Sequence, residues 1–338
     1  MNYILKDQNA VYYECGFSCD NELLLSLGSE KFFITDPRYT TEAKEKVQGA
    51  QVIEAKDLIK AAREILRKSR IKSLHYDPKE FSCADFAKLE SKLSLSFKKS
   101  PDLSWKRRLI KSDHEIALIA KSAELNAQAF DRFATRLREC EGVSERRLHF
   151  EAVAILTRYG EYELSFDPIF AIGPNAAKPH AYPSDQILKR GDLVLFDGGI
   201  KYERYCSDRT RTAYYDEEFS FKKDQRFENP RIQRAYDLVK KAQEKAIEGA
   251  RSGMRAKDLD RIAREIIDRS EFQGCFVHSL GHGVGLDIHE MPFINSRNDQ
   301  ILEDGMVFTI EPGIYVPGEF GIRIEDMVVL RSGKAEVL

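Results

Sequence analysis

Two segments of this chain repeat one another, and a repeat of this kind leaves few folds open to it. Residues 185–199 read DQILKRGDLVLFDGG and residues 299–313 read DQILEDGMVFTIEPG. Their first four residues are identical, Gly191 and Gly199 align with Gly305 and Gly313, and Asp197 aligns with Glu311 at the end of an apolar run. The helix-like stretches upstream of the two segments are more faintly alike. This pattern predicts two copies of a helix–helix–strand unit packed about a pseudo-twofold axis.

The residues before the repeats have a different organisation, which indicates a separate domain. Short apolar runs alternate there with segments of helical periodicity, as in an α/β domain. The apolar runs are at 23–27, 31–35 and 71–76, and the periodic segments lie near 57–68 and 80–93. Ser112 and Glu115 then have the spacing of a helix capping box at the start of an apolar stripe. We therefore expect an α/β N-terminal domain over residues 1–103 and an α+β C-terminal domain with the internal repeat over residues 104–338.

The composition excludes several classes of partner. Lysine and arginine number 53 against 55 aspartates and glutamates, a net charge of -2, which gives no electrostatic reason to expect binding to nucleic acid or to a membrane surface. No apolar run approaches the length of a membrane span, and the N-terminal residues lack the core of a signal peptide. The six cysteines are scattered and include no C-x-x-C pair. We expect a cytoplasmic protein with reduced thiols.

Four carboxylates occupy matching places in the two repeats. Asp197 closes the apolar strand LVLFDGG and Asp208 follows in SDRTRT, while Glu311 closes VFTIEPG and Glu325 follows in GIRIED. A lone Asp-Gly is more often a surface turn. Four acids in symmetric places at the ends of apolar strands are different, because clustered buried carboxylates repel one another unless cations lie between them. The arrangement favours a metal site.

A stretch rich in histidine and glycine, VHSLGHGVGLDIHE at 277–290, supplies His278, His282 and His289. Its glycines disfavour a helix, so we expect a bent strand or a loop. Four carboxylates and one of these imidazoles would make five ligands, with a charge of about -4 that two divalent ions balance. Such a set favours Mn, Co, Fe or Zn. Two ions roughly 3.5–4 Å apart can share a hydroxide that is nucleophilic near neutral pH, which is the equipment of a hydrolase.

The motifs FDGG, SDRTRT, HSLGHGVGLDIHE, TIEPGIY and GIRIED resemble those of the pita-bread metallopeptidase family, over residues from about 105 to 338. The family includes methionine aminopeptidase, aminopeptidase P, prolidase and creatinase. FFITDPRYTTEA at 32–43 resembles the N-terminal domain of creatinase and prolidase, with Pro37 where that domain has glycine. Methionine aminopeptidase lacks such a domain. The resemblance therefore implies a creatinase-like N-terminal domain joined to a pita-bread catalytic domain.

The resemblance also implies a dinuclear metal centre. The ligands that it assigns are Asp197, Asp208, His282, Glu311 and Glu325. Asp208 and Glu325 would bridge two divalent ions, with manganese expected ahead of cobalt, iron or zinc. Glu311 would also carry a proton from the bridging hydroxide to the leaving proline nitrogen. Creatinase and the non-catalytic binding modules of this fold have changed ligand positions, so the full set here counts against them.

Further side chains are implied in substrate binding. His278 and His289 match positions that flank the scissile peptide and stabilise the tetrahedral intermediate, and His180 matches a pocket histidine that grips the substrate. Arg323 is expected to orient the ligand two residues after it, and Tyr315 and Phe293 are candidate residues of the substrate pocket. Without the resemblance, His180 would be an ordinary loop residue, Arg323 as readily a structural ion-pair partner, and Tyr315 as readily a packing residue.

The substrate class depends on one position. The N-terminal domain resembles that of the proline-specific members, which cleave X-Pro bonds. A dipeptidase must bind the carboxylate of the product proline, for which arginine is suited. In several microbial prolidases this arginine follows the last motif histidine by four residues, where this chain has Phe293; Arg297 lies four residues further on.

We therefore expect an Xaa-Pro aminopeptidase (aminopeptidase P) that acts on proline-containing peptides. Xaa-Pro dipeptidase (prolidase) is the alternative, and a creatinase-like hydrolase or a binding module is less favoured. Family members are commonly homodimers or larger homo-oligomers, and the resemblance implies the same assembly here.

Overall fold

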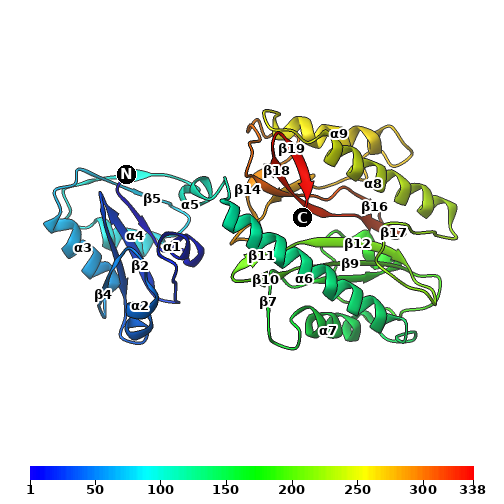
Figure 1. Ribbon diagram of the computed structural model, residues 1–338, viewed down its shortest axis with the longest axis horizontal. Helices are drawn as coiled ribbons and strands as arrows, with labels where there is room; N and C mark the ends of the chain where they lie inside the picture. Colours follow the sequence, from blue (N-terminus) through cyan, green and yellow to red (C-terminus); the bar gives the residue numbers. More distant parts are fainter. The chain divides into compact units, whose positions relative to one another are not determined.

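The computed structural model describes residues 1–338, and the chain forms two compact units, Met1–Arg108 and Leu109–Leu338 (Figure 1). The short helix α5 (Leu103–Arg107) ends the first unit. A boundary between residues 103 and 104, as expected from the sequence, would cut this helix. The first unit is therefore a few residues longer than expected.

The first unit is built on a six-stranded mixed sheet in the order β4-β3-β2-β1-β5-β6. Its strands are β1 (Tyr3–Leu5), β2 (Glu22–Leu27), β3 (Glu30–Thr35), β4 (Gln51–Glu54), β5 (Ser73–Tyr76) and β6 (Ser96–Lys99). Its other helices are α1 (Gln8–Cys15), α2 (Thr40–Lys46), α3 (Leu58–Lys68) and α4 (Cys83–Glu90). Leu23 and Leu25 of β2 belong to a core that includes α3, and Leu24 belongs to a core that includes α1. Because both faces of the sheet are covered, β2 reads as a continuous apolar run, and the expected α/β domain is confirmed.

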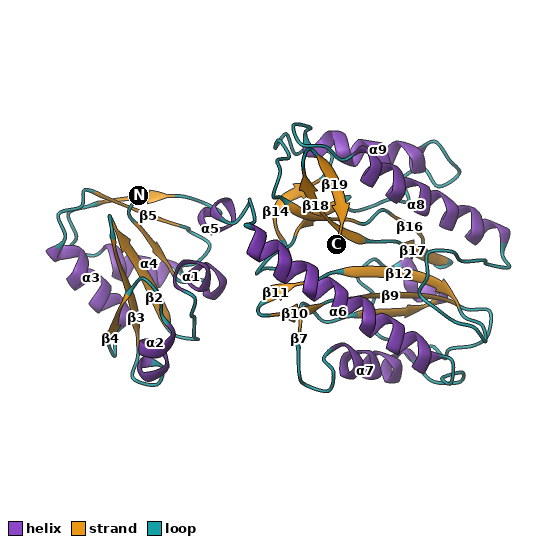
Figure 2. Cartoon of the chain, viewed as in Figure 1, coloured by secondary structure: helices purple, strands orange, loops and turns teal.

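The second unit contains two copies of one arrangement, each with two helices and a small antiparallel sheet. The first copy has α6 (Asp113–Leu137), α7 (Glu145–Leu156), β8 (Ile169–Ile172), β9 (Leu193–Gly198) and β12 (Arg209–Tyr214). The second has α8 (Pro230–Gly249), α9 (Ala256–Asp268), β13 (Gly281–Gly283), β15 (Val307–Ile310) and β18 (Asp326–Arg331). Figure 2 shows α8 and α9 together on one side of this unit and α7 on the opposite side, with strands between them.

Shorter strands complete the sheets of this unit. β14 (Glu290–Ile294) and β19 (Lys334–Val337) extend the second sheet to the order β14-β13-β15-β18-β19, whereas the first sheet has the order β12-β9-β8. β16 (Gly313–Val316) and β17 (Phe320–Arg323) form a hairpin. β7 (Glu163–Leu164), β10 (Ile200–Tyr202) and β11 (Tyr205–Cys206) form a third sheet, and the 3₁₀ helix η1 (Gly173–Ala177) follows β8.

Side chains at the helix starts explain where the helices of this unit begin. Ser112 accepts a hydrogen bond from the Glu115 N–H, and the Glu115 side chain accepts one from the Ser112 N–H, so the expected capping box is present. Ser144 caps α7 by accepting from a backbone N–H of the first turn, and Asn229, followed by Pro230, caps α8 in the same way.

Backbone hydrogen bonds recur at matching places in the two copies. In each, the segment before the repeated strand is held to the loop between the two helices. The bonds run from Gly142 N to Leu188 O and from Leu188 N to Val143 O, and from Gly253 N to Leu302 O and from Leu302 N to Met254 O. The aligned residues Gly191 and Gly305 have φ values of 90° and 85°, which glycine adopts without strain. The pseudo-twofold repeat predicted from the sequence is confirmed.

Two further findings concern the chain as a whole. None of its helices combines the length and the apolar character that a membrane span needs. All six cysteines are free.

Candidate metal centre

The five expected ligands come from both copies of the repeat and line one cavity of about 460 Å³. Asp197 lies in β9 and Asp208 directly precedes β12; Glu311 directly follows β15, Glu325 directly precedes β18, and His282 lies in β13. β9 pairs with β12, and β15 pairs with β18. Each pair of strands therefore brings its own two carboxylates to the cavity.

The glycines of β13 allow His282 to enter this cluster. A Cβ atom on Gly281 would lie 1.9 Å from the carbonyl oxygen of Thr309, and one on Gly283 would lie 2.2 Å from that of Met291. Larger residues would therefore push β13 away from its neighbours β14 and β15. The strand has a bulge between His282 and Gly283, in agreement with the bent strand expected from the sequence.

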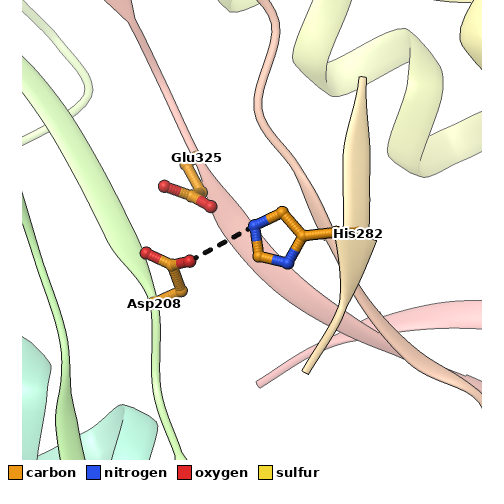
Figure 3. Close-up of side chains that lie close together, drawn as sticks. All are labelled: Asp208, His282 and Glu325. Atoms are coloured by element: carbon orange, nitrogen blue, oxygen red, sulfur yellow. Dashed lines mark ion pairs between the residues drawn. The ribbon is translucent and has the colours of Figure 1, made fainter. Parts of the chain in front are cut away.

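Three of the expected ligands lie close enough together to hold one ion. Asp208, His282 and Glu325 each place one ligand atom within 4.8 Å of the others, and Figure 3 shows the three side chains directed toward one another. His282 Nε2 lies 3.5 Å from Asp208 Oδ2 and 3.3 Å from Glu311 Oε1. Asp197 faces the same cavity. This group is suited to hold a metal ion.

Buried carboxylate oxygens without partners indicate that the centre fits cations. Asp197 Oδ1, Asp208 Oδ1 and Glu325 Oε1 are buried and accept no hydrogen bond, although a buried unsatisfied polar atom is costly. Burial and the neighbouring carboxylates raise the pKa of Asp208 and of Glu325 well above the usual range, and burial raises the pKa of Glu311 to about 7. Divalent cations among these oxygens would supply the missing contacts and balance the charge.

The imidazole of His282 has the form that a metal ligand requires. Burial, and then His289, lower its pKa to about 3, so the ring is neutral near neutral pH. Nδ1 lies 3.2 Å from Gly283 O, and a proton on Nδ1 leaves the lone pair of Nε2 facing oxygens of Asp208 and Glu311. Such an arrangement is repulsive unless a cation lies between the lone pairs, and an imidazole with carboxylates suits a divalent transition metal.

Arg323 pairs with Asp197 instead of Glu325, which corrects the expected partner. Its Nη2 lies 2.6 Å from Asp197 Oδ2. The guanidinium reaches Glu325 only through Thr210: Nε donates to Thr210 Oγ1 at 3.0 Å, and Thr210 Oγ1 donates to Glu325 Oε2 at 2.6 Å. Burial opposes ionisation of Arg323, but its interactions with Tyr315, Asp197 and the nearby glutamates outweigh this effect and raise its pKa above the usual value.

Two threonines that the sequence analysis missed hold ligand carboxylates. Thr210 joins Glu325 to Arg323, and Thr309 Oγ1 donates to Glu311 Oε1 at 3.0 Å while it accepts from the His282 N–H at 3.1 Å. Each threonine lies two residues from a ligand, Asp208 or Glu311. That spacing on a strand, which puts both side chains on one face, is the signal that could have found them.

Tyr315 links His278 to Arg323. Its hydroxyl lies 2.9 Å from His278 Nε2 and accepts a hydrogen bond from Arg323 Nη1 at 2.8 Å. His278 Nδ1 lies 2.8 Å from Ser279 O, so a proton on Nδ1 leaves Nε2 to accept from Tyr315. Burial, and then Arg323, lower the pKa of His278 to about 3, and burial raises the pKa of Tyr315 to about 12. Both groups are therefore uncharged near neutral pH.

The three histidines expected near the substrate, His180, His278 and His289, all line the cavity. The rings of His289 and His282 meet edge to face, with 4.3 Å between their centroids. Burial, and then His180, lower the pKa of His289, so its ring is neutral at pH 7. His180 is exposed, in the irregular segment after η1.

Phe293 and Arg297 do not line the cavity. Phe293 is the cross-strand partner of His282, but β14 alternates: Glu290, Pro292 and Ile294 are buried, and Phe293 is on the half-buried face. The structure thus does not bring Phe293 into the expected pocket. Arg297 is exposed in the segment after β14. Arg323 is the only lysine or arginine among the lining residues. Its guanidinium already pairs with Asp197 and donates hydrogen bonds to Thr210 and Tyr315.

Comparison with known proteins gives relatives along the whole chain. An uncharacterized peptidase of Staphylococcus aureus is 42% identical over 238 residues, which are 70% of this chain and 64% of the relative. This chain thus spans about 64% of the length of that curated relative. An Xaa-Pro dipeptidase from Bacillus anthracis has a similar structure, with a TM-score of 0.91 and 30% identity over 99% of this chain and 92% of that one. An X-Pro aminopeptidase from Thermotoga maritima has a TM-score of 0.87 and 31% identity over 99% and 94%.

Family models match both units. Residues 2–110 match the creatinase/prolidase N-terminal domain, and residues 117–332 match metallopeptidase family M24. The second match covers the cavity, both copies of the repeat and all five expected ligands. The chain therefore belongs to metallopeptidase family M24 and has a creatinase/prolidase N-terminal domain.

Proposed function

We propose that this protein is a dinuclear metallopeptidase that hydrolyses the X-Pro bond at the N-terminus of peptides, as an Xaa-Pro aminopeptidase does. The observation that carries the proposal is the set of five ligand side chains from two symmetric copies that line one cavity, with three buried carboxylate oxygens that have no partner in the protein. Membership of family M24 and the likeness to solved X-Pro peptidases support the reaction and the substrate class.

The metal ligands in this proposal are Asp197, Asp208, His282, Glu311 and Glu325. Two divalent ions held there, manganese ahead of cobalt, iron or zinc, would activate water and polarise the scissile carbonyl. Asp197 and Glu325 each have one oxygen fixed by a protein donor and one free oxygen, so their free oxygens are already oriented for the ions.

The remaining polar groups of the cavity bind the substrate and move protons. Both ring nitrogens of His278 have partners within the protein, Ser279 O and the Tyr315 hydroxyl, so we assign to His289 the hydrogen bond to the developing oxyanion. His180 would grip the substrate from the irregular wall segment. The leaving proline nitrogen has no proton of its own and must gain one, and Glu311, beside His282, is the carrier that we assign.

The charge of the cavity favours an aminopeptidase over a dipeptidase. A dipeptidase must hold the carboxylate of the product proline, and arginine is suited to this task. Arg323 is already paired with Asp197 and bonded to Tyr315, and no other arginine or lysine lines the cavity. A peptide substrate that continues beyond proline needs no such cation.

Xaa-Pro dipeptidase is the second candidate, because the similar structures include an Xaa-Pro dipeptidase and a prolidase from Pyrococcus furiosus that is 34% identical. In that case Arg297 would be the residue that reads the carboxylate. A homodimer or larger homo-oligomer and a cytoplasmic location are proposed on the family resemblance alone.

The deciding experiment compares Ala-Pro-Ala with Ala-Pro as substrates of chelator-treated protein with and without added manganese. We expect manganese-dependent release of alanine from the tripeptide, binding of two ions per chain in a calorimetric titration, and loss of both in D208A. Hydrolysis of the dipeptide alone would show that the protein is an Xaa-Pro dipeptidase and not an Xaa-Pro aminopeptidase. Two bound ions without hydrolysis of either peptide would contradict the X-Pro assignment, and no stoichiometric metal would indicate a binding module.

A further inference from the structure

One wall of the cavity is an irregular segment that follows η1. It contributes Pro179, His180, Ala181, Tyr182 and Pro183 to the lining. The segment belongs to no helix or strand between Lys178 and Ser184. Its backbone groups must therefore find partners outside regular secondary structure if the wall is to keep one shape.

Glu145, the first residue of α7, holds the end of this wall at Ser184 and two residues that precede the wall. Its side chain is fully buried and accepts hydrogen bonds from Ile172 N at 2.6 Å, Ser184 N at 2.8 Å and Ser184 Oγ at 2.5 Å. It also accepts from Asn175 Nδ2 at 2.8 Å. Hydrogen bonds to a carboxylate are stronger than neutral ones, and a carboxylate at a helix N-terminus is further favoured by the helix dipole. The Glu145 carboxylate thus joins the end of the wall to β8 and to η1.

Two more contacts fix the start of the wall and the backbone of Tyr182. Asn175 Nδ2 donates to the carbonyl oxygen of Tyr182 at 3.0 Å, so Asn175 joins Glu145 to Tyr182. On the other side, Arg323 Nη1 donates to Pro179 O at 3.2 Å, and the same guanidinium pairs with Asp197. The wall is therefore held in a set position relative to a metal ligand.

The side chain of Tyr182 has no partner, although its backbone is held. It is 86% exposed while it lines the cavity, so it lies at the opening. It makes no hydrogen bond, ion pair or ring contact within the chain. Covering a large, water-exposed aromatic ring with an apolar or aromatic group is energetically favourable. When the first two residues of a peptide fill the cavity, the residues after proline pass through this opening.

We propose that Tyr182 determines specificity for peptides that continue beyond proline, by binding the residue after it, and that Glu145 and Asn175 are positioning residues that hold the Tyr182 backbone. This inference rests on the proposed function and names its substrate class as X-Pro peptides with a third residue. A ring on a fixed backbone loses little conformational entropy on binding, which favours its use as a contact surface.

The first test compares Ala-Pro-amide, which has no third residue, with Ala-Pro-Phe-Ala in the manganese-loaded full chain. Tyr159 supplies a matched control, because it is 85% exposed and does not line the cavity. We expect Y182A to lower kcat/KM for Ala-Pro-Phe-Ala about five- to tenfold, through KM, and to leave Ala-Pro-amide unchanged. Y182F should restore the loss, and Y159A should match the wild type on both substrates.

A binding measurement on metal-free protein gives a readout that does not need turnover. Calorimetric titration with Ala-Pro-Phe-Ala should give a Kd about five- to tenfold weaker in Y182A than in Y159A. An equal loss of kcat/KM on both substrates, or no loss on either, would overturn the role of Tyr182. Failure of the wild type to hydrolyse either substrate would instead overturn the proposed function, and the two failures are therefore distinguishable.

The positioning role is tested by N175A, which removes the bond to the Tyr182 carbonyl and leaves Glu145 with its other donors. We expect N175A to raise KM for Ala-Pro-Phe-Ala with unchanged kcat/KM for Ala-Pro-amide, and the double variant N175A/Y182A to lose no more than Y182A alone. Additive losses, or equal losses on both substrates, would show that Asn175 acts on the fold in general and not through Tyr182.

Discussion

Two carboxylates of the proposed metal centre each have one oxygen bonded to the protein and one oxygen that is free in the cavity. Asp197 gives one oxygen to Arg323 and Glu325 gives one to Thr210, and in both residues the other oxygen has no partner. A bond to one oxygen fixes the rotation of the carboxylate and so directs the free oxygen at the place of the ion. The affinity of the centre then depends on residues that never touch a metal.

Replacing Thr210 with valine keeps the shape of the side chain and removes the hydroxyl that joins Glu325 to Arg323. We expect T210V to weaken manganese binding about tenfold to hundredfold in a calorimetric titration. Thr212 offers the matched control, since it is also a fully buried threonine of β12 and bonds only to the backbone of Arg323. Equal affinities in T210V and T212V would exclude an orienting role for Thr210.

At this scale the sequence could predict which side chains meet in the cavity but not the pairs they form. The symmetric places of the acids anticipate four residues that the cavity gathers. The partner of Arg323 was predicted as Glu325, two residues along the chain, whereas it is Asp197 from the other copy of the repeat. That pairing depends on how the two copies pack, and no local spacing encodes it.

Among the elements, α9 holds the irregular segment that precedes β13 and contains His278. Arg264 Nη1 donates to Phe276 O at 2.8 Å and Nη2 donates to His278 O at 2.9 Å. Asp260, one turn earlier, is fully buried, accepts from Arg264 and also from the Leu280 N–H at 3.2 Å. One ion pair on a helix thus replaces the ladder of bonds that a strand would supply.

Removing this support should affect catalysis more than metal binding. R264A leaves the backbone of His278 without its donor, and small displacements of groups around a reacting centre reduce rates strongly. We expect kcat for Ala-Pro-Ala to fall about tenfold or more, with two manganese ions still bound. R261A is the control on the same helix: Arg261 is exposed and pairs only with Asp258 and Glu265 at the surface, where ion pairs contribute little. Comparable kcat values for R264A and R261A would contradict the positioning role.

Elements with a strong local signal are the ones that the sequence predicts. The capping box of α6 and the apolar run of β2 need only neighbouring residues, and both are present. The segments that contain His180 and His278 have no such signal, because their backbone bonds go to Glu145 on α7 and to Arg264 on α9. Their conformation follows from tertiary contacts and could not be predicted from local pattern.

For the whole molecule, the repeat made the architecture of the second unit predictable. The residue at which the first unit ends was harder to predict. The expected boundary fell a few residues early because α5 packs with the first unit. Leu103 belongs to a core of that unit, and Arg107 Nε lies 2.7 Å from Glu14 Oε1. The capping box at Ser112 shows where the next helix begins, but it does not show where the first unit ends.

The first unit also contains a carboxylate that makes its stability depend on pH. Glu80 Oε2 accepts hydrogen bonds from Lys6 N at 2.6 Å and Asp7 N at 3.0 Å, yet burial raises the pKa of Glu80 from 4.5 to about 7. Between these two values the folded state binds the proton and the unfolded state does not. The stabilising contribution of the protonated form is therefore complete below pH 4.5 and is lost as the pH rises through about 7.

E80Q should remove this dependence, because a glutamine oxygen can accept both backbone hydrogen bonds and does not ionise. We expect wild type and E80Q to have similar stability at pH 5, and wild type to lose about 2 kcal/mol relative to E80Q at pH 8. Urea unfolding followed by fluorescence measures this unit directly, since the single tryptophan, Trp105, lies in α5. E30Q, at an exposed glutamate of β3, is the control and should follow the wild type. A difference between wild type and E80Q that is the same at both pH values would show that the Glu80 carboxyl does not change its ionisation on folding.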